Sequence, residues 1–183
     1  MKLLQATKRT RLERMTSRHL SLLSTLFNDA QTLKFLQVKK INAFFLSYKS
    51  EMKLKQGEAG LYCVFDKKSD NFLGRAGVRN NGTRQNVDWE LHILLHGKAQ
   101  KKDYGAEIIL ATMKDAFENR GAHTISFVIA EQNAPMQKLA RRLGFFSKKT
   151  HQDDGYLHYE VNRQNFDLLH SPRAFIANDF RHQ

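Results

Sequence analysis

Cysteine, proline and long apolar runs are scarce in this chain of 183 residues, and each scarcity excludes a class of protein. The single cysteine, Cys63, cannot form an intrachain disulfide and suits a reducing compartment, which indicates a cytoplasmic protein. No apolar run approaches the roughly 18–20 residues that span a bilayer. The N-terminal residues turn basic before the apolar stretch of a signal peptide develops. We therefore expect no membrane partner.

Motifs of dedicated nucleic-acid readers and of metal sites are also missing. The sequence contains no zinc-ligand spacing, basic zipper or RNP-like motif. His92 and His96 are four positions apart, but they fall on a predicted strand and have no third ligand, so we expect no metal. The formal net charge of +12 still predicts attraction to phosphates, acidic proteins or RNA. Because the basic residues are scattered along the chain, we expect only non-specific contact with nucleic acid.

Apolar side chains are abundant enough for one folded domain. Hydrophobic residues make up 41% of the sequence and include 13 phenylalanines, whereas only 2 prolines and 10 glycines are available for linkers. A chain of this length supports one full core and is short for two. We therefore predict a single domain over residues 1–183, in which residues 162–183 are a C-terminal extension that wraps as a terminal helix.

Strand-like alternation, helical spacing of apolar residues and turn residues divide the chain into elements. The predicted strands cover residues 6–15, 61–65, 72–78, 87–95, 123–130, 145–147 and 156–161. The predicted helices cover residues 16–27, 29–36, 38–56, 104–119 and 134–143. Short turns join the first strands and helices separate the later ones, so parallel pairing is expected in the middle of the sheet. This order predicts a mixed α/β sheet with helices on both faces.

The sequence QKKDYGAEII, at Gln100–Ile109, joins a predicted strand to a predicted helix. The first N–H groups of a helix have no internal partner and the helix dipole is positive there, so this end of a helix favours an anion. Lys98, Lys101 and Lys102 add positive charge at the same place, and Gly105 is small. Taken alone, the stretch is better explained as an ordinary basic turn between a strand and a helix. A phosphate-binding role needs support from other segments of the sequence.

Four segments together resemble the GNAT superfamily of acyl-CoA-dependent N-acetyltransferases, and most of all its RimJ/RimL-like branch. They are TKRTRLERMTSRHL, WELHILL followed by QKKDYGAEII, NAPMQKLARRLGFF, and GYLHYEVN. The resemblance extends from Thr7 to Phe166, and it favours cofactor binding at the basic turn. It also implies a mostly antiparallel central sheet of about seven strands that splays in the middle, with helices on both faces.

The resemblance implies a site for acetyl-CoA at the end of the central strand. Its pyrophosphate loop, which binds through backbone N–H groups, corresponds to Gln100, Lys101, Lys102, Asp103, Tyr104, Gly105 and Ala106. The backbone N–H groups that stabilise the oxyanion correspond to the stretch Ile93, Leu94 and Leu95.

A later helix of the family runs alongside the cofactor. Asn133 corresponds to a residue that contacts the pantetheine arm or the acetyl region. Lys138, Arg141 and Arg142 fall on the same helix, where they fit either phosphate ligands or a solvated helix face. Glu107, in the first turn of the preceding helix, is expected to point away from the phosphates.

Acetyl transfer from a thioester to an amine needs a neutral amine, an oriented electrophile and a stabilised oxyanion. Glu90 matches a strand glutamate common in the branch and is the candidate base for the ammonium proton, directly or through a water. His92 lies on the same strand face and is the second candidate, because an ordinary histidine pKa of about 6.5 suits proton transfer at neutral pH. Each side chain also fits a paired strand residue without a catalytic role.

The expected activity is transfer of an acetyl group from acetyl-CoA to a primary amine by direct attack in a ternary complex. The amine is a protein N-terminus or a small amine, and the enzyme is a monomer or a homodimer. Three residues depart from the family pattern: Asp103 replaces a loop glycine, Met136 a serine, and Ala140 a tyrosine that protonates the leaving thiolate. These departures support a rival, a non-catalytic acyl-CoA-binding or interaction module on the same fold. A basic RNA-binding protein is a third hypothesis, and its affinity would fall steeply with salt.

Overall fold

The computed structural model describes residues 6–35, 59–82, 88–148 and 155–170. The helix predicted over residues 38–56 lies outside the described residues, as does the end of the C-terminal extension. Among the residues that the structure describes, no helix is long and apolar enough to cross a membrane.

Seven strands form one sheet in the order β1-β2-β3-β4-β5-β7-β6. They are β1 (Thr10–Arg14), β2 (Ala59–Asp66), β3 (Phe72–Asn80), β4 (Trp89–Leu95), β5 (Thr124–Ala130), β6 (Phe146–Lys148) and β7 (Tyr156–Asn162). Neighbouring strands are antiparallel except β4 and β5, which run parallel. The predicted mixed and mostly antiparallel sheet, with a parallel pair in its middle, is therefore confirmed.

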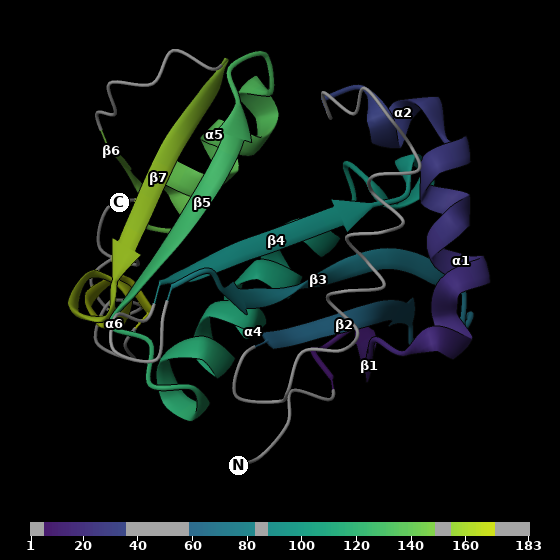
Figure 1. Cartoon of the computed structure of the whole chain (residues 1–183), viewed down its shortest axis with the longest axis horizontal. Coiled ribbons are helices and arrows are strands. Elements are labelled where there is room, and N and C mark those ends of the chain that lie inside the picture. Colours follow the sequence, from purple (N-terminus) through teal and green to yellow (C-terminus); the bar gives the residue numbers. More distant parts are fainter. Residues whose placement is uncertain (1–5, 36–58, 83–87, 149–154, 171–183) are drawn as a thin grey trace, which may run out of the picture.

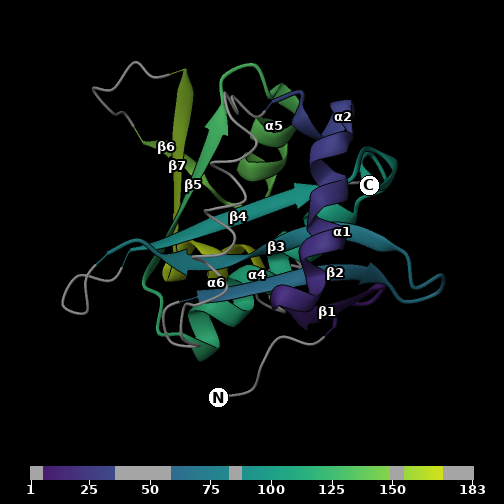
Figure 2. The ribbon, with the colours of Figure 1, turned by 45° about the vertical axis from the view of Figure 1, so that its right-hand side comes forward.

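Helices cover both faces of this sheet (Figures 1 and 2). Within the described residues, the α-helices are α1 (Leu20–Thr25), α2 (Ala30–Leu33), α4 (Tyr104–Asn119), α5 (Ala134–Arg142) and α6 (Arg163–His170). The 3-10 helices are η1 (Ser17–His19), η2 (Leu26–Asn28) and η3 (Gly97–Ala99). The helix predicted over residues 16–27 thus consists of three consecutive pieces, and the predicted terminal helix begins at the end of β7.

Local signals explain where the two long helices end. Helix α4 is followed by Gly121, whose φ of +68° is a left-handed conformation that glycine adopts without strain. Helix α5 begins at Asn133, whose side-chain oxygen accepts a hydrogen bond from the backbone N–H of Met136 at 3.2 Å. It is followed by Gly144, with a φ of +93°.

The larger core lies between the sheet and helices α4, α5 and α6. Its helical members include Ile109, Met113, Phe117, Ala140 and Phe166, and its strand members include Trp89, Leu91, Ile125, Phe127, Tyr159 and Val161. Strands from both halves of the sheet therefore share one core. The apolar residues of α4 that recur at helical spacing, Ile109, Met113 and Phe117, therefore form its buried face.

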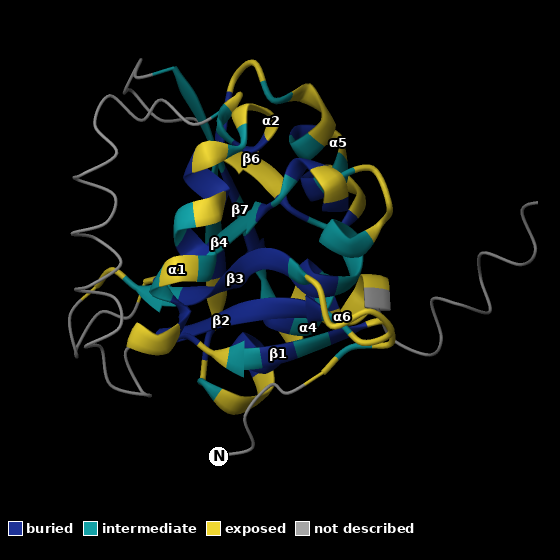
Figure 3. Cartoon of the chain, turned by 90° about the vertical axis from the view of Figure 1, so that its right-hand side faces the viewer, coloured by how far each residue is buried: buried dark blue, intermediate teal, exposed yellow. Residues whose placement is uncertain are grey.

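A second core lies on the opposite face, under α1 and η2. Leu23, Leu26 and Phe27 pack there against β2, together with the fully buried Cys63. Burial raises the pKa of the Cys63 thiol to about 12, so at neutral pH it is an unreactive thiol in the core. Figure 3 shows the buried strands β2 and β3 behind the mixed surface of α1.

The sheet is not paired equally along its length. Strands β3 and β4 are in register over seven residue pairs, from Gly74 opposite Leu95 to Asn80 opposite Trp89. Strands β4 and β5 pair only at Trp89 opposite Ile125 and at Glu90 opposite Ser126. Beyond Glu90 the two strands diverge (Figure 1). The predicted splay therefore lies between the two parallel strands.

Candidate active site

The loop that follows β4, residues 96–103, leads from the diverging strands into helix α4. Gln100 ties it back to the strand, because its Nε2 atom donates a hydrogen bond to the carbonyl oxygen of Leu95 at 3.0 Å. Lys101 and Asp103 both have a φ of +58°, so left-handed residues stand on either side of Lys102. Turns of this kind can direct successive N–H groups toward an anion.

Asp103 occupies the position where the resemblance places a glycine, and its backbone has the conformation that favours glycine. Aspartate tolerates a left-handed φ better than most residues do. Its carboxylate is 82% exposed and lies 3.9 Å from the guanidinium of Arg142 on α5. Asp103 makes no side-chain hydrogen bond that caps α4.

Glu107, in the first turn of α4, points toward Thr7 and Arg9, which precede β1. Its carboxylate accepts hydrogen bonds from the backbone N–H of Arg9 at 2.6 Å, from Arg9 Nε at 2.7 Å and from the Thr7 hydroxyl. A β-carbon added at Gly105 would meet only Leu139, at an ordinary contact distance of 3.5 Å. Packing within the described chain therefore does not require glycine at position 105.

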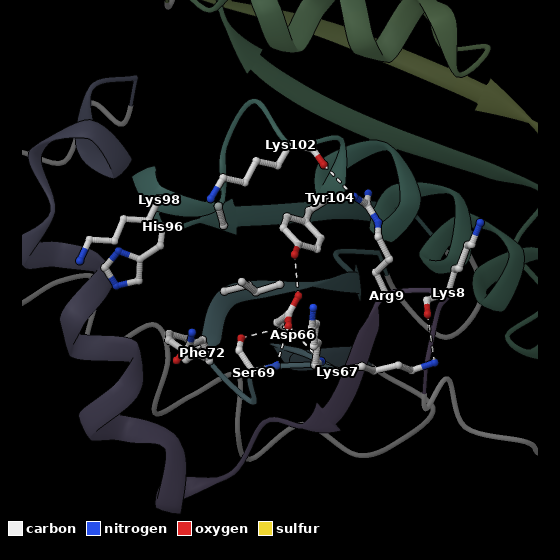
Figure 4. A pocket seen from close by; sticks show the side chains of 14 residues that line it. Lys8, Arg9, Asp66, Lys67, Ser69, Phe72, His96, Lys98, Lys102 and Tyr104 are labelled. Atoms are coloured by element: carbon white, nitrogen blue, oxygen red, sulfur yellow. Dashed lines mark hydrogen bonds between the residues drawn. The ribbon is translucent and has the colours of Figure 1, made fainter.

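The side chain of Tyr104 points toward the β2–β3 hairpin rather than toward β5 (Figure 4). Its hydroxyl donates a hydrogen bond to Asp66 at 2.5 Å. This bond, together with those from Ser69 and the backbone N–H of Lys68, lowers the pKa of Asp66 to about 2. The same contact raises the pKa of Tyr104. Any contribution of Tyr104 to the loop thus comes from its backbone.

Sequence reasoning missed a cluster around Asp29 that holds the start of this loop. Asp29 is the first residue of the helix predicted over residues 29–36, and it caps α2 by accepting a hydrogen bond from the backbone N–H of Gln31 at 3.1 Å. Its other oxygen accepts from the Gly97 N–H at 2.6 Å, the Thr32 hydroxyl at 2.8 Å and His96 Nδ1 at 2.8 Å. These bonds, the one from Gly97 foremost, lower the pKa of Asp29.

Glu90 and His92 lie close together on β4, on the sheet face that α1 and α2 partly cover. His92 Nε2 is 3.4 Å from Glu90 Oε2, an ion-pair distance without hydrogen-bond geometry, and each side chain is 18% exposed. Asn81 Nδ2 donates to the same carboxylate, and Arg79 is 3.9 Å away. Burial opposes ionisation of Glu90, but these neighbours outweigh it and lower its pKa. Glu90 is therefore a carboxylate at neutral pH.

The remaining predicted residues lie on β4 and α5. Backbone groups of Ile93, Leu94 and Leu95 fall in the part of β4 that has no β5 partner within the described strands. The side-chain oxygen of Asn133 caps α5 by accepting the hydrogen bond from Met136. Lys138 is exposed on the same helix. Among the described residues, no group of three or more His, Cys, Asp or Glu side chains is placed to hold a metal ion.

Comparison with known proteins identifies the family. A family model of the acetyltransferase (GNAT) domain matches residues 9–146. An acetyltransferase from Agrobacterium tumefaciens superposes with a TM-score of 0.72 at 16% identity, over 86% of this chain and 93% of that one. A spermidine N-acetyltransferase from Vibrio cholerae, in complex with CoA and spermine, superposes with a TM-score of 0.71 at 13% identity, over 86% of this chain and 98% of that one.

A third similar structure, also from Vibrio cholerae, is of a protein proposed to be a ribosomal-protein-serine acetyltransferase. Its TM-score is 0.66 at 19% identity, over 86% of this chain and 95% of that one. At these identities the superpositions show a shared fold, and the family match rests on the sequence model. The chain belongs to the GNAT acetyltransferase family, whose members take the acetyl group from acetyl-CoA.

Proposed function

We propose that this protein is an N-acetyltransferase that moves an acetyl group from acetyl-CoA to a primary amine. The observation that carries the proposal is the divergence of β4 and β5 immediately beside a loop with two left-handed residues and the uncapped start of α4. An opened parallel pair gives an extended thioester arm a backbone to lie along, and a helix start gives its phosphates N–H donors.

In the proposed complex, the backbone N–H groups of residues 100–106 bind the pyrophosphate. Lys101, which is exposed, adds positive charge there, and Lys138 does so from α5. Arg142 neutralises the Asp103 carboxylate, which otherwise repels the phosphates. The backbone of Asn133, at the start of α5, contacts the pantetheine arm.

The reaction is direct attack, and bound acetyl-CoA supplies the activated acetyl group. The lone pair of the neutral amine forms a bond to the thioester carbon, and the carbon–sulfur bond then breaks. Backbone N–H groups around Ile93–Leu95 donate hydrogen bonds to the oxygen that becomes negative. The thiolate leaves, the nitrogen gives up its extra proton to solvent to become a neutral amide, and the thiolate takes up a proton from solvent. No metal and no covalent enzyme intermediate takes part.

Glu90 and His92 manage the proton of the incoming ammonium. The ionised Glu90 attracts the ammonium group, and the Glu90–His92 pair accepts its proton directly or through a water. Because His92, Asn81 and Arg79 outweigh the effect of burial and lower the pKa of Glu90, the carboxylate stays charged. Both residues lie at the point where β4 and β5 part, next to the proposed position of the thioester.

For the acceptor we propose an amine of the kind that the RimJ/RimL-like branch uses, a protein N-terminal amine, with small amines as the alternative. One structural neighbour is proposed to be a ribosomal-protein acetyltransferase and another is bound to spermine, which supports amines of both sizes. The net charge of +12 favours docking at an acidic or RNA-rich partner. The proposed catalytic unit is one cytoplasmic domain.

A non-catalytic acyl-CoA-binding module is the second candidate, and two positions on α5 support it. Met136 stands where the family commonly has a serine, and its backbone N–H donates the hydrogen bond to the Asn133 side-chain oxygen that caps α5. Ala140 stands where many members have a tyrosine that protonates the thiolate, and it is fully buried in the core. The position therefore supplies no acid.

Calorimetry and a thiol-release assay separate the two candidates. The full chain is titrated with acetyl-CoA and then incubated with acetyl-CoA and a panel of N-terminal peptides and polyamines. The enzyme predicts binding and release of free CoA thiol with at least one amine. Binding without thiol release across the panel would support the module, and absence of binding would contradict both candidates.

A further inference from the structure

A basic pocket lies on the hairpin side of the β4–α4 loop (Figure 4). The cavity has a volume of about 890 Å³ and is lined by the two residues before β1, by the β2–β3 turn with the adjoining strand ends, and by the β4–α4 loop with the start of α4. Among the described residues that line it, Asp66 is the single acidic one. Six are cationic: Lys8, Arg9, Lys67, Lys68, Lys98 and Lys102.

Part of this positive charge is already used by the protein. Arg9 pairs with Glu107 at 2.7 Å, and Lys67 donates hydrogen bonds to backbone carbonyls at the start of the described chain. Asp66 accepts bonds from Tyr104, from Ser69 and from the backbone N–H of Lys68, so its carboxylate is occupied.

Four lysines remain available to an incoming anion. They form no ion pair within the described part of the chain, and they are Lys8, Lys68, Lys98 and Lys102. They come from three separate segments, so in Figure 4 the cationic side chains stand on opposite sides of the pocket. A concave surface lined by one sign of charge concentrates its field on whatever enters it.

The pocket borders the proposed cofactor site, but most of its lining lies outside that site. Of the residues predicted to bind acetyl-CoA, only Lys102 and Tyr104 line it. Lys101 and Asp103, the left-handed residues of the loop, do not. In the sheet, β2 and β3 lie on one side of β4 and β5 lies on the other, so the hairpin pocket and the diverging strands flank β4 from opposite sides.

We propose that this pocket binds a small molecule carrying two or more phosphate groups, independently of acetyl-CoA. Several lysine ammonium groups around one cavity suit clustered phosphates, because each ammonium group is a compact point charge. The volume falls in the usual range of small-molecule sites, roughly 300–1,000 Å³, which favours a compact ligand over an RNA chain. Phe72 and Leu73 also line the cavity and offer apolar contact to the body of such a molecule.

Titration with inorganic tripolyphosphate tests this proposal on the full chain. Calorimetry at physiological salt is expected to give one site, with the same affinity in the absence and presence of saturating acetyl-CoA. Lys68→Glu and Lys98→Glu each remove a cation from a different wall and are expected to weaken binding about tenfold. The control is Lys114→Glu, a change at a 65% exposed lysine on α4 outside the pocket, which should leave the affinity unchanged.

Three outcomes would overturn the proposal. Displacement of tripolyphosphate by acetyl-CoA would make the pocket part of the cofactor site. If Lys114→Glu weakened tripolyphosphate binding as much as the pocket variants do, the affinity would depend on the net charge of the protein and not on the pocket. Binding of an RNA oligonucleotide that depends on Lys68 and Lys98, without tripolyphosphate binding, would assign the surface to nucleic acid. The direct titration does not require that the protein transfers acetyl groups, so failure here leaves the proposed function intact.

Discussion

The two halves of the sheet are built differently on either side of the β4–β5 joint. Strands β2 and β3 are buried over almost their whole length, and β3 pairs with β4 over seven residue pairs. On the other side, β5, β7 and β6 form a three-stranded unit whose edge strand β6 is exposed at every residue. Backbone pairing across the joint amounts to two residue pairs.

The contrast shows that side chains, rather than strand pairing, connect the halves. The core under α4, α5 and α6 contains residues of β3 and β4 as well as residues of β5 and β7. A joint of this kind leaves the β4 edge that faces β5 unpaired beyond Glu90 within the described strands, while β3 still pairs with the other edge. The proposed reaction uses backbone N–H groups at this edge, so its groups come from β4 rather than from β5.

The largest effect is expected on catalysis, from a substitution of the proposed base Glu90 on β4. Glu90→Gln removes the charge but keeps the shape, and kcat/KM for the best amine should fall by about 10²–10⁴-fold, the usual contribution of a general base. The matched control is Glu160→Gln on β7. Glu160 faces Ser126, the same residue that pairs with Glu90, but from the other half of the sheet. Equal losses in both variants would contradict an active site confined to β4.

The next effect concerns how the halves are held together. Ile125 is fully buried at the joint, and Ile125→Ala should lower the free energy of unfolding by about 2–5 kcal/mol, as for other large-to-small core changes. Val128→Ala, on the opposite face of the same strand, should cost less than half as much, because Val128 is partly exposed. Urea denaturation measures both, and similar costs would mean that the shared core is not what joins the halves.

A smaller effect is expected at the end of β4, where the loop meets α4. Gly105→Val should raise the Kd for acetyl-CoA about tenfold by crowding the backbone near the phosphates. The melting temperature should change little, because a β-carbon at this position has room beside Leu139. Ala111→Val, farther along the same helix, controls for the helix propensity of valine. An unchanged Kd would contradict the assignment of the loop.

The smallest effect is expected at the hairpin of the N-terminal half, and it depends on pH. The hydrogen bond from Tyr104, with those from Ser69 and Lys68, lowers the pKa of Asp66 to about 2, against about 3.9 in an unfolded chain. The contribution of Asp66 to stability is therefore complete above about pH 4 and is lost as the pH falls toward 2. Denaturation curves measured between about pH 5 and pH 2, a window that contains both pKa values, give the free energy of unfolding at each pH. Asp66→Asn should reduce its decrease toward low pH, whereas Asp70→Asn should leave that decrease unchanged.

Local patterns predicted much of the fold. The helix predicted over residues 104–119 has the same limits in the structure, because a strong apolar period ends at Gly121. The first strand was predicted over residues 6–15 but spans only Thr10–Arg14, where it pairs with β2. Its limits depend on the partner strand, which a local pattern does not contain.

Tertiary contacts explain what the sequence could not predict about the site. The bonds from Gly97 and His96 to Asp29 join residues almost 70 positions apart, and no periodicity connects them. The lysines of the basic pocket likewise come from positions 8, 68, 98 and 102. Asp103 replaces a loop glycine, and its backbone still adopts a φ of +58°, a conformation that depends on the fold of the whole loop.

The carboxylate of Asp29 has a thermodynamic consequence for ternary-complex formation. It bonds helix α2 and the first residues of the β4–α4 loop at the same time, so neither moves without straining the other. Linkage is reciprocal: an acceptor that shifts α2, and through Asp29 the loop, changes the affinity for acetyl-CoA by the same factor by which acetyl-CoA changes the affinity for that acceptor. Order of addition would then change the path to the ternary complex but never its overall free energy.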